Sequence, residues 1–279
     1  MLAIMLTVVS CNPYKVKVPA NDGKPGDQTV NVAGGGFSKK EGVLRLVQYN
    51  VGAFSKYMDN STGMIADMLL EMQADVCSLN ETDSCNTRHN VYQVQELGKA
   101  LGSGWEYTFG RAMPYRGGAY GNGVVAHAPV LKSFNIILPK GSGSEQRSAS
   151  GVETEKYVYL STHIDHKSSE AAMQQLAVLS ATLNEMYGSK NKAVFVAGDF
   201  NMEPDNAAFA DFMKNFKMIS ARQYTFGSQT PSKCIDYIFA FNNGAQYVVE
   251  KTDVPTIFSK GDVKKASDHL PVYVDVIIK

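Results

Sequence analysis

Residues 194–206 read VFVAGDFNMEPDN, and the predictions for this chain start from that stretch. Its first four residues form a short apolar run of the kind that fills a buried strand. Gly198 interrupts the run, and Asp199 and Asn201 follow two residues apart. In an extended chain this spacing places the carboxylate and the carboxamide on one face. The stretch therefore predicts a buried strand with an acid and an amide at its carboxyl end, where open α/β folds build their sites.

A turn without chemistry is the alternative interpretation, because Asp and Asn are common in turns. Pro204 and the two polar residues after it predict a turn that leads into a helix. Three other predicted strands favour a functional site over a turn without chemistry, because a polar side chain lies at or just after the end of each. They are Leu44–Asn50, which ends on Asn50, Asp75–Asn80, which Glu81 follows, and Lys156–Thr162, which His163 follows.

Helices are predicted between strands from apolar residues at helical spacing, as in the Met-rich stripe of Thr62–Gln73. Strands and helices alternate, but several connections are too short for a crossover helix. The pattern predicts an α/β (α+β) protein with two mixed, mainly antiparallel sheets flanked by helices, rather than a doubly wound parallel sheet. One domain is expected over residues 43–279.

The chain has 27 basic and 27 acidic side chains, which are unevenly distributed. Residues 1–40 hold five lysines and two aspartates, which leaves residues 41–279 with a net charge of −3. Such a domain has no global attraction to nucleic acid, although a local basic patch could supply one. The four cysteines have neither the number nor the spacing of a disulfide framework or a zinc site.

The N-terminus predicts export. The apolar run Leu2–Val9 is too short to span a bilayer. Ser10 and Cys11 follow it, and this order resembles a bacterial lipoprotein signal, in which a small residue precedes the cysteine that becomes lipidated. A basic region before the run is missing, and a frayed apolar N-terminus is the alternative. Residues 1–11 are interpreted as a signal remnant with a lipid anchor at Cys11. Residues 12–42, rich in Pro, Gly, Lys and Asp, are interpreted as a flexible tether.

Polar side chains at or beside strand ends form the candidate site. They are Asn50, Glu81, His163, Asp199, Asn201, Asp236, Asp268 and His269. Carboxylates and amides are the ligands of a hard cation such as Mg²⁺, which is held by one or two carboxylates and substrate phosphate. Zinc would need more His or Cys at close spacing. The sequence therefore predicts a Mg²⁺ site, with Mn²⁺ as a possible substitute, beside an acid-base pair.

An ordered set of seven motifs covers residues 44–278. The motifs are QYN (Gln48–Asn50), LNE (Leu79–Glu81), YGNGVVAHAP (Tyr120–Pro129), THIDH (Thr162–His166), GDFN (Gly198–Asn201), IDYIF (Ile235–Phe239) and SDHLPV (Ser267–Val272). Each alone is weak, but in this order the set resembles the endonuclease/exonuclease/phosphatase superfamily with the deoxyribonuclease-I-like fold. The resemblance implies a four-layer sandwich, two sheets face to face with helices outside, and a site at the strand ends between the sheets.

The resemblance also implies roles for the residues that match the motifs. Glu81 would be the main metal-binding carboxylate, with Asn50 and Asp268 nearby. Asp199 and Asn201 would position the attacking water and the phosphate.

The two histidines of the set would act on the phosphoryl group. His269, polarised by Asp236, would act on the phosphate or the water, and His163 would contact the phosphate or assist the leaving oxygen. A structural role is the alternative for Asp236 and His163, and turn formation for Asn50 and Asn201. His166 is interpreted as a loop residue.

Substrate phosphate is expected on Arg111, Asn122 and Arg147, with Arg116 and Lys167 nearby. Two departures from the family pattern, Asn80 before Glu81 and His127 in the YGN motif, are expected to bear on substrate more than on activity.

The predicted function is a metal-dependent phosphoesterase that uses metal-assisted attack of water on a phosphodiester or phosphomonoester. A small phosphoester or a lipid or sugar head group is the expected substrate. A nuclease of the same fold and a non-catalytic binding relative are the alternatives. The protein is expected to be a monomer, tethered to a membrane in the periplasm or at the cell surface.

Overall fold

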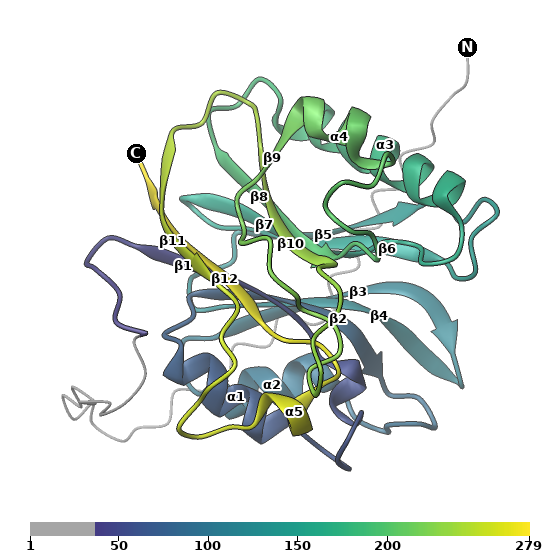
Figure 1. The fold of residues 1–279 in the computed structure, drawn as a ribbon, viewed down its shortest axis with the longest axis vertical. Coiled ribbons are helices and arrows are strands. Elements are labelled where there is room, and N and C mark those ends of the chain that lie inside the picture. Colours follow the sequence, from purple (N-terminus) through teal and green to yellow (C-terminus); the bar gives the residue numbers. More distant parts are fainter. Residues whose placement is uncertain (1–36) are drawn as a thin grey trace.

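The computed structural model describes residues 37–279, in which two six-stranded sheets pack face to face with helices on both outer faces (Figure 1). The first sheet has the order β11 (Tyr247–Asp253), β12 (Val272–Ile278), β1 (Leu44–Asn50), β2 (Val76–Ser84), β4 (Gly118–Ala126), β3 (Glu106–Tyr115). The second has the order β5 (Lys132–Leu138), β6 (Arg147–Glu153), β7 (Tyr157–His163), β8 (Ala193–Asp199), β10 (Asp236–Phe241), β9 (Phe216–Met218). The predicted sandwich of two mixed, mainly antiparallel sheets is confirmed.

The helices divide between the two outer faces. The first sheet is covered by α1 (Thr62–Glu71) and α2 (Gln93–Leu101), with the short α5 (Val263–Ala266) beside them (Figure 1). The second is covered by α3 (Ser169–Tyr187) and α4 (Phe209–Asn215). A 3₁₀ turn, η1 (Gly52–Phe54), follows β1.

Each sheet contains one parallel pair at its centre, β1 with β2 and β7 with β8. Parallel strands bring their carboxyl ends to one edge of the sheet. In register, Asn50 lies beside Asn80 in the first sheet and His163 beside Asp199 in the second. The antiparallel β10 places Asp236 next to Asp199. The topology thus gathers the predicted site residues at one edge of the sandwich.

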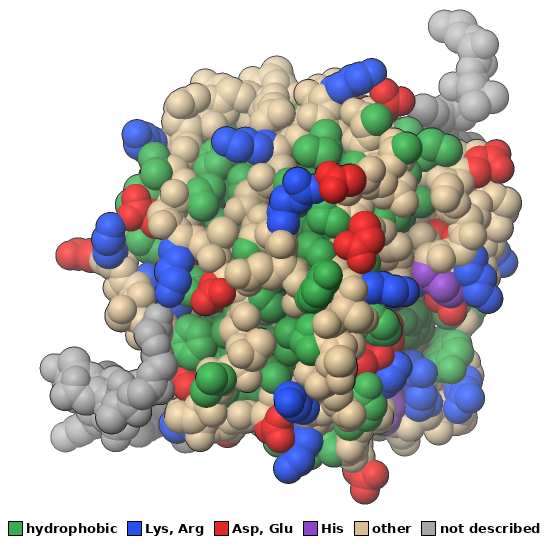
Figure 2. All heavy atoms as spheres, in the orientation of Figure 1, with side chains coloured by type: hydrophobic (Ala, Val, Ile, Leu, Met, Phe, Trp, Pro, Cys, Tyr) green, Lys and Arg blue, Asp and Glu red, His purple; other side chains and the backbone are tan. Residues whose placement is uncertain are grey.

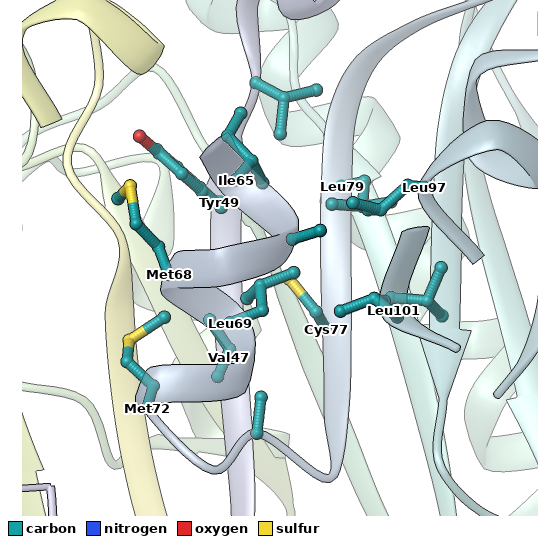
Figure 3. Close-up of a cluster of buried hydrophobic side chains, with 14 of the residues drawn as sticks. Val47, Tyr49, Ile65, Met68, Leu69, Met72, Cys77, Leu79, Leu97 and Leu101 are labelled. Carbon is teal, nitrogen blue, oxygen red and sulfur yellow. The ribbon is translucent and has the colours of Figure 1, made fainter. Parts of the chain in front are cut away.

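Three apolar clusters hold the layers together. One lies between the first sheet and its helices, where the Met-rich stripe of α1 packs on β1 and β2 (Figure 3). A second lies between the other sheet and its two helices, and a third fills the space between the sheets. The Met-rich stripe of the predicted helix is therefore part of the core.

Side chains that point between the sheets change from apolar to polar toward the site. On β1 the inward series is Leu46, Gln48 and Asn50, whereas the alternate residues Val47 and Tyr49 pack toward the helices. On β8 the inward series is Phe195, Ala197 and Asp199. The period of two that defines a strand therefore also delivers the site residues to the inter-sheet face.

Several boundaries differ from those predicted. Gly198 does not end its strand: a Cβ there would lie 1.9 Å from the carbonyl oxygen of Thr162, so glycine lets β8 approach β7 closely. Residues 105–122, which carried no strand prediction, form most of the β3–β4 hairpin. The many glycine and polar residues of this stretch leave no clear alternation of apolar and polar side chains, which is the pattern that predicts a strand.

The predicted tether ends earlier than residue 42. Phe37 is buried in the first cluster and stacks on Phe258, with ring centroids 5.3 Å apart, and Lys39 pairs with Asp75 at 2.6 Å. The predicted signal remnant and Cys11 lie outside the described residues. Within residues 37–279 no helix has both the length and the apolar composition needed to cross a membrane.

A buried ion pair joins the first and last strands of the domain, β1 and β12. Arg45 on β1 is fully buried, and its Nε and Nη2 each donate to a carboxylate oxygen of Asp275 on β12 at 2.7 Å. Its Nη1 donates to the carbonyl oxygens of Phe37 and Met72. The guanidinium therefore joins β1 and β12 to the end of α1 and to the segment before β1.

We expect Asp275→Leu to lower the free energy of unfolding by about 3–5 kcal/mol, because it leaves the Arg45 charge buried without its partner. The double variant Arg45→Met/Asp275→Leu should recover part of that loss in urea unfolding. A double variant less stable than the single one would contradict this account.

The loop before β6 is attached to the start of α3 through one carboxylate. Asp165 accepts hydrogen bonds from the backbone nitrogens of Lys167 and Ser168 at 2.8 Å, and from the backbone nitrogen and hydroxyl of Ser144. Burial opposes ionisation of Asp165, but these bonds outweigh it and lower the pKa from 3.8 to about 2. Nothing in the THIDH motif indicates this role of Asp165.

Because the folded-state pKa is depressed, the stability that Asp165 contributes is present above pH 4 and disappears as the pH falls towards 2. Asp165→Asn should therefore lower the free energy of unfolding by up to about 2 kcal/mol at pH 7. The difference in the free energy of unfolding between Asp165→Asn and wild type should be smaller at pH 3 than at pH 7. Urea unfolding at both pH values measures it. Asp67→Asn, on the exposed face of α1, is the control, and a gap for Asp165→Asn that does not depend on pH would refute the assignment.

Candidate functional site

A buried polar network joins the two sheets beneath the site, and Asn80 is its centre. Its Oδ1 accepts from Gln48 Nε2 at 2.6 Å and from the backbone nitrogen of Asp199 at 2.8 Å. Its Nδ2 donates to Asn122 Oδ1 at 3.1 Å and to the carbonyl oxygen of Thr162 at 2.8 Å. Asn80 thus ties β2 to both strands of the parallel pair opposite. Asn80 therefore contacts a residue assigned to chemistry, and the expectation that it bears mainly on substrate stays a prediction.

Above this network, Asp236, His269 and Asp199 form a row, joined by a hydrogen bond between Asp236 and His269 and by a longer ionic contact between His269 and Asp199. His269 Nδ1 lies 2.8 Å from Asp236 Oδ2, and His269 Nε2 lies 3.6 Å from Asp199 Oδ2. Gln48 Nε2 donates to the other oxygen of Asp236 at 3.2 Å. Asp236 is fully buried, and its two oxygens are both used. The carboxylate therefore fixes the ring of His269 with Nε2 directed to Asp199.

Burial and mutual charge shift the titration of this row. Burial and the charge of Asp236 raise the pKa of Asp199 to about 7. Burial opposes protonation of His269, but the charges of Asp236 and Asp199 outweigh it and raise its pKa to about 10. The row therefore combines a carboxylate of unusually high proton affinity with an imidazole that retains its proton at neutral pH.

His163, the last residue of β7, approaches the same carboxylate from the other side. Its Nε2 lies 3.5 Å from Asp199 Oδ2. Burial, reinforced by the nearby charge of Arg147, holds its pKa well below the usual range. Its Nδ1 is buried without a partner among residues 37–279. A neutral imidazole with a free ring nitrogen suits hydrogen bonding to a ligand better than proton donation.

Asp199 and Asn201 meet in a turn rather than on one face of a strand. Asp199 ends β8, and its Oδ1 accepts from the backbone nitrogen of Asn201 at 2.8 Å. Asn201 has a positive φ of 53°, and its Nδ2 donates to the carbonyl oxygen of Ile164 at 3.0 Å. Both residues line the cavity. The prediction that they come together is correct, but the turn brings it about.

Glu81 is directed to the cavity by a β-bulge. The pairing of β2 with β4 shifts register between Leu79 and Thr82, and Glu81 has a positive φ of 58°. Bulges of this kind redirect a side chain and are common beside active sites. For a residue other than glycine this backbone conformation costs about 1–3 kcal/mol. The predicted strand end at Asn80 is wrong, since β2 continues through the bulge to Ser84.

Asn50 faces the acids with its amide nitrogen. Its Nδ2 donates to Glu81 Oε1 at 3.1 Å and to Asp199 Oδ2 at 3.0 Å, while its Oδ1 accepts from the backbone nitrogen of Gly52. In this orientation the amide oxygen accepts one hydrogen bond and keeps its second lone pair, so the metal-ligand role of Asn50 stays a prediction. Asn50 also holds two carboxylates in place.

Lys56, from the segment after η1, forms an ion pair with one of the predicted metal ligands, Asp268. Its Nζ lies 2.7 Å from Asp268 Oδ2. Burial lowers the Lys56 pKa, but Asp268 and then Glu81 outweigh it and raise the value. An ammonium group is therefore already attracted to this acid pair. Both acids line the cavity and offer the oxygen donors that Mg²⁺ or Mn²⁺ prefers, so the residues fit such an ion.

Asp199, Asp236 and His269 are the one group of three acidic or histidine side chains within residues 37–279 whose ligand atoms all lie within 4.8 Å. An ion there would have to break the bond of Asp236 to His269 or to Gln48. Glu81 and Asp268 are the better candidates for a metal, which leaves the row intact for acid-base work.

A cavity of about 530 Å³ opens above these residues. Figure 2 shows basic, acidic and histidine side chains around a hollow at the right of the molecule. The lining includes four acids and four bases, namely Glu81, Glu145, Asp199, Asp268, Lys56, Arg88, Arg147 and Lys233. The Lys and Arg charges balance those of the acids, and the protonated His269 is bonded to the Asp236 carboxylate beneath the cavity, so the cavity is not strongly cationic.

Arg147 is the predicted phosphate ligand that reaches the cavity. It is the first residue of β6 and is 3 % exposed. Its Nη1 lies 3.2 Å from Glu145 Oε2 and its Nη2 lies 3.3 Å from His166 Nδ1, whereas its buried Nε has no partner among residues 37–279. His166, expected to be only a loop residue, also lines the cavity.

The other residues predicted near the phosphate lie elsewhere. Arg111 is exposed on β3, and neither it nor Arg116 or Lys167 lines the cavity. Asn122 is buried in the inter-sheet network, where its Nδ2 donates to the carbonyl oxygen of Ser148. His127 is exposed and stacks on Trp105, outside the cavity.

Lys56, Arg88 and Lys233 replace them as cations of the cavity wall. No periodicity or short motif identifies these three residues, because each comes from an irregular loop. Lys56 lies six residues after Asn50, and that closeness in sequence was the one available signal.

Comparison with known proteins agrees with this fold. No curated protein matches the sequence. Among solved structures, a mannosyl-6-phosphatase of Bacteroides thetaiotaomicron superposes with a TM-score of 0.69 at 19% identity, covering 84% of this chain and 100% of the other. The human Nocturnin catalytic domain with bound sulfate gives 0.65 at 20% identity, covering 85% and 94%. A TDP2 of D. rerio with a single-stranded DNA product gives 0.63 at 18% identity, covering 84% and 98%.

These likenesses concern the fold. The sequence itself matches the model of the Endonuclease/Exonuclease/phosphatase family over residues 29–269. That range includes every residue of the candidate site, and the enzymes that the family description names all hydrolyse phosphoesters. Because the match spans most of the chain, this protein belongs to the endonuclease/exonuclease/phosphatase family.

Proposed function

We propose that the chain is a metal-dependent phosphoesterase that uses Mg²⁺, with Mn²⁺ as a substitute, to hydrolyse a small phosphomonoester or phosphodiester. One observation carries the proposal. His269, which is hydrogen-bonded to the buried Asp236, and Asp199, 3.6 Å from His269, line the same cavity as an acid pair, Glu81 and Asp268.

The metal would be held by Glu81 and Asp268, and when bound it neutralises phosphate charge and polarises water. Asp199, with its raised pKa, is suited to accept the proton of the attacking water. Asn50 and the backbone of Asn201 hold its two oxygens in place.

Three further residues act on the phosphoryl group. His269 donates from Nε2 to a phosphoryl oxygen, with Asp236 fixing its ring. The Arg147 guanidinium neutralises phosphate charge, and neutral His163 donates a hydrogen bond to the phosphate or to the leaving oxygen.

A small substrate is favoured over a polynucleotide. Binding a nucleic acid backbone requires several cations along a track, whereas the cavity lining has balanced charges. The similarity to a phosphatase of a sugar phosphate supports a lipid or sugar head-group phosphate. The nuclease alternative rests on the similarity to TDP2 with its DNA product.

Export and a lipid anchor at Cys11 are also part of this proposal. They rest on the sequence pattern of residues 1–11. A membrane-tethered monomer outside the cytoplasm would meet small phosphoesters released there.

Glu81→Gln should lower the Mg²⁺-dependent rate of phosphoester hydrolysis by at least about 100-fold, because it removes a charged ligand worth several kcal/mol. The rise of Tm that Mg²⁺ produces in wild type should also shrink. Glu155→Gln, an exposed site in the β6–β7 turn, is the matched control. Full activity of Glu81→Gln, or of wild type in excess chelator, would exclude the proposed metal.

His269→Ala should lower kcat by roughly 10²–10⁴, the range expected for general acid-base catalysis. Asp236→Asn should lower it less while leaving KM close to wild type, because the ring loses its orienting carboxylate. Steady-state kinetics on a small phosphoester measures both effects. His127→Ala removes an exposed histidine outside the cavity as a control, and a His269→Ala rate within a few-fold of wild type contradicts the role.

A further inference from the structure

One wall of the cavity has no part in the chemistry described above. It consists of Arg88, Met113, Tyr115 and Tyr120, and we call it the hairpin wall. Two of its residues come from β3 and β4 and one ends β3, while Arg88 lies in the loop after β2. The β3–β4 hairpin extends at the right of the lower sheet in Figure 1.

The hairpin wall is fixed in position from below. Arg88 Nε and Nη2 donate to the two oxygens of the fully buried Asp83 at 2.8 and 2.9 Å. Asn86 Oδ1 accepts from the backbone nitrogens of Arg88 and His89, and the backbone nitrogen of Thr87 donates to the carbonyl oxygen of Arg116. The loop is thus bonded to the tip of the hairpin, so that the wall is organised without a ligand.

The wall adjoins the predicted metal ligands. Tyr120 pairs with Asp83 in the β2–β4 ladder, two residues beyond Glu81. Tyr120, Glu81 and Arg147 all line the same cavity, so the wall meets both the metal-binding acid and the phosphate-binding arginine. A group bonded to a phosphate at Arg147 could extend directly over this wall.

The wall presents hydrogen-bonding groups more than an open stacking surface. The guanidinium carbons of Arg88 and Arg116 lie over the Tyr115 ring, 4.8 and 5.4 Å from its centroid. The Tyr115 and Tyr120 rings are inclined by 51°, so they form no parallel slot for a nucleobase. A planar base would have to displace a cation–π contact.

Polar groups of the wall remain available to a ligand. Neither the Tyr115 nor the Tyr120 hydroxyl hydrogen-bonds within residues 37–279, and Asp83 leaves the Nη1 of Arg88 unused. Two phenol hydroxyls and a guanidinium nitrogen can each bond an alcohol oxygen. The thioether of Met113 supplies apolar contact between them.

We propose that the hairpin wall is a leaving-group subsite for a hydroxyl-rich ring, and that the substrate class is a sugar phosphate monoester. The assignment rests on the proposed phosphoesterase function. One phosphate is placed at Arg147 and the acid pair, and the ring lies against Tyr115 and Tyr120 with its hydroxyls bonded to the wall. The cavity of about 530 Å³ has the size of a small-molecule site.

The experiment compares kcat/KM for glucose 6-phosphate, methyl phosphate, adenosine 5′-monophosphate and a single-stranded DNA 20-mer, with Mg²⁺, on the full chain. The variants are Tyr115→Ala and Tyr120→Phe, and the second removes only a hydroxyl. Tyr224→Ala is the matched control, because Tyr224 is 57% exposed and does not line the cavity. Calorimetry of glucose 6-phosphate binding accompanies the kinetics.

Wild type should prefer glucose 6-phosphate to methyl phosphate by at least about 10-fold, the effect of one or two well-made hydrogen bonds. Tyr115→Ala should reduce that ratio by about 10-fold and Tyr120→Phe by a smaller factor, while Tyr224→Ala keeps the wild-type ratio. Equal ratios in wild type and both variants would overturn the subsite. A preference for the nucleotide or the DNA that Tyr115→Ala abolishes would overturn the sugar assignment.

Failure of the proposed function gives a different result. In that case wild type hydrolyses none of the four compounds. The calorimetry then decides on the subsite by itself: weaker binding of glucose 6-phosphate to Tyr115→Ala than to wild type supports it, and equal or absent binding overturns it.

Discussion

The constraint on which the site depends is the burial of polar side chains between two sheets. A buried polar group is costly unless it is hydrogen-bonded, and Asn80 meets that demand for both sheets at once. Its bond to the backbone of Asp199 fixes the carboxylate relative to β2, and its bond to Gln48 connects it to the residue that holds Asp236. The position of the acid-base row is therefore a consequence of how the sheets are joined.

The same constraint explains the division of labour among the acids. Asp236 lies deepest and uses both oxygens internally, so it serves to orient His269. Glu81, redirected by its bulge, and Asp268, paired with the half-exposed Lys56, line the cavity, and Asp268 can exchange Lys56 for an ion. Asp199 lies between the two groups, where burial and charge raise its proton affinity.

The fold and the strand-end positions of the acids could be predicted from strand periodicity, whereas the pairing of His269 with Asp236 was implied by the resemblance to the family. Asp199, His163 and Asp236 lie on inward positions that alternate with apolar residues, so a period of two locates them. The conformations that the sequence did not reveal depend on the backbone or on distant contacts. Glu81 depends on a bulge, Asn50 on which atom of its amide faces Gly52, and Arg88 on a loop bonded to a hairpin that lacked a clear alternating pattern.

The most direct test of this account is a crystal structure of the protein with Mn²⁺ and inorganic phosphate, in which anomalous scattering locates the metal. The account predicts Mn²⁺ bound by Glu81 and Asp268, with Lys56 moved from Asp268, phosphate on Arg147, and the bond between Asp236 and His269 intact. An Mn²⁺ ion ligated by Asp236 and His269, with that bond broken, would contradict it.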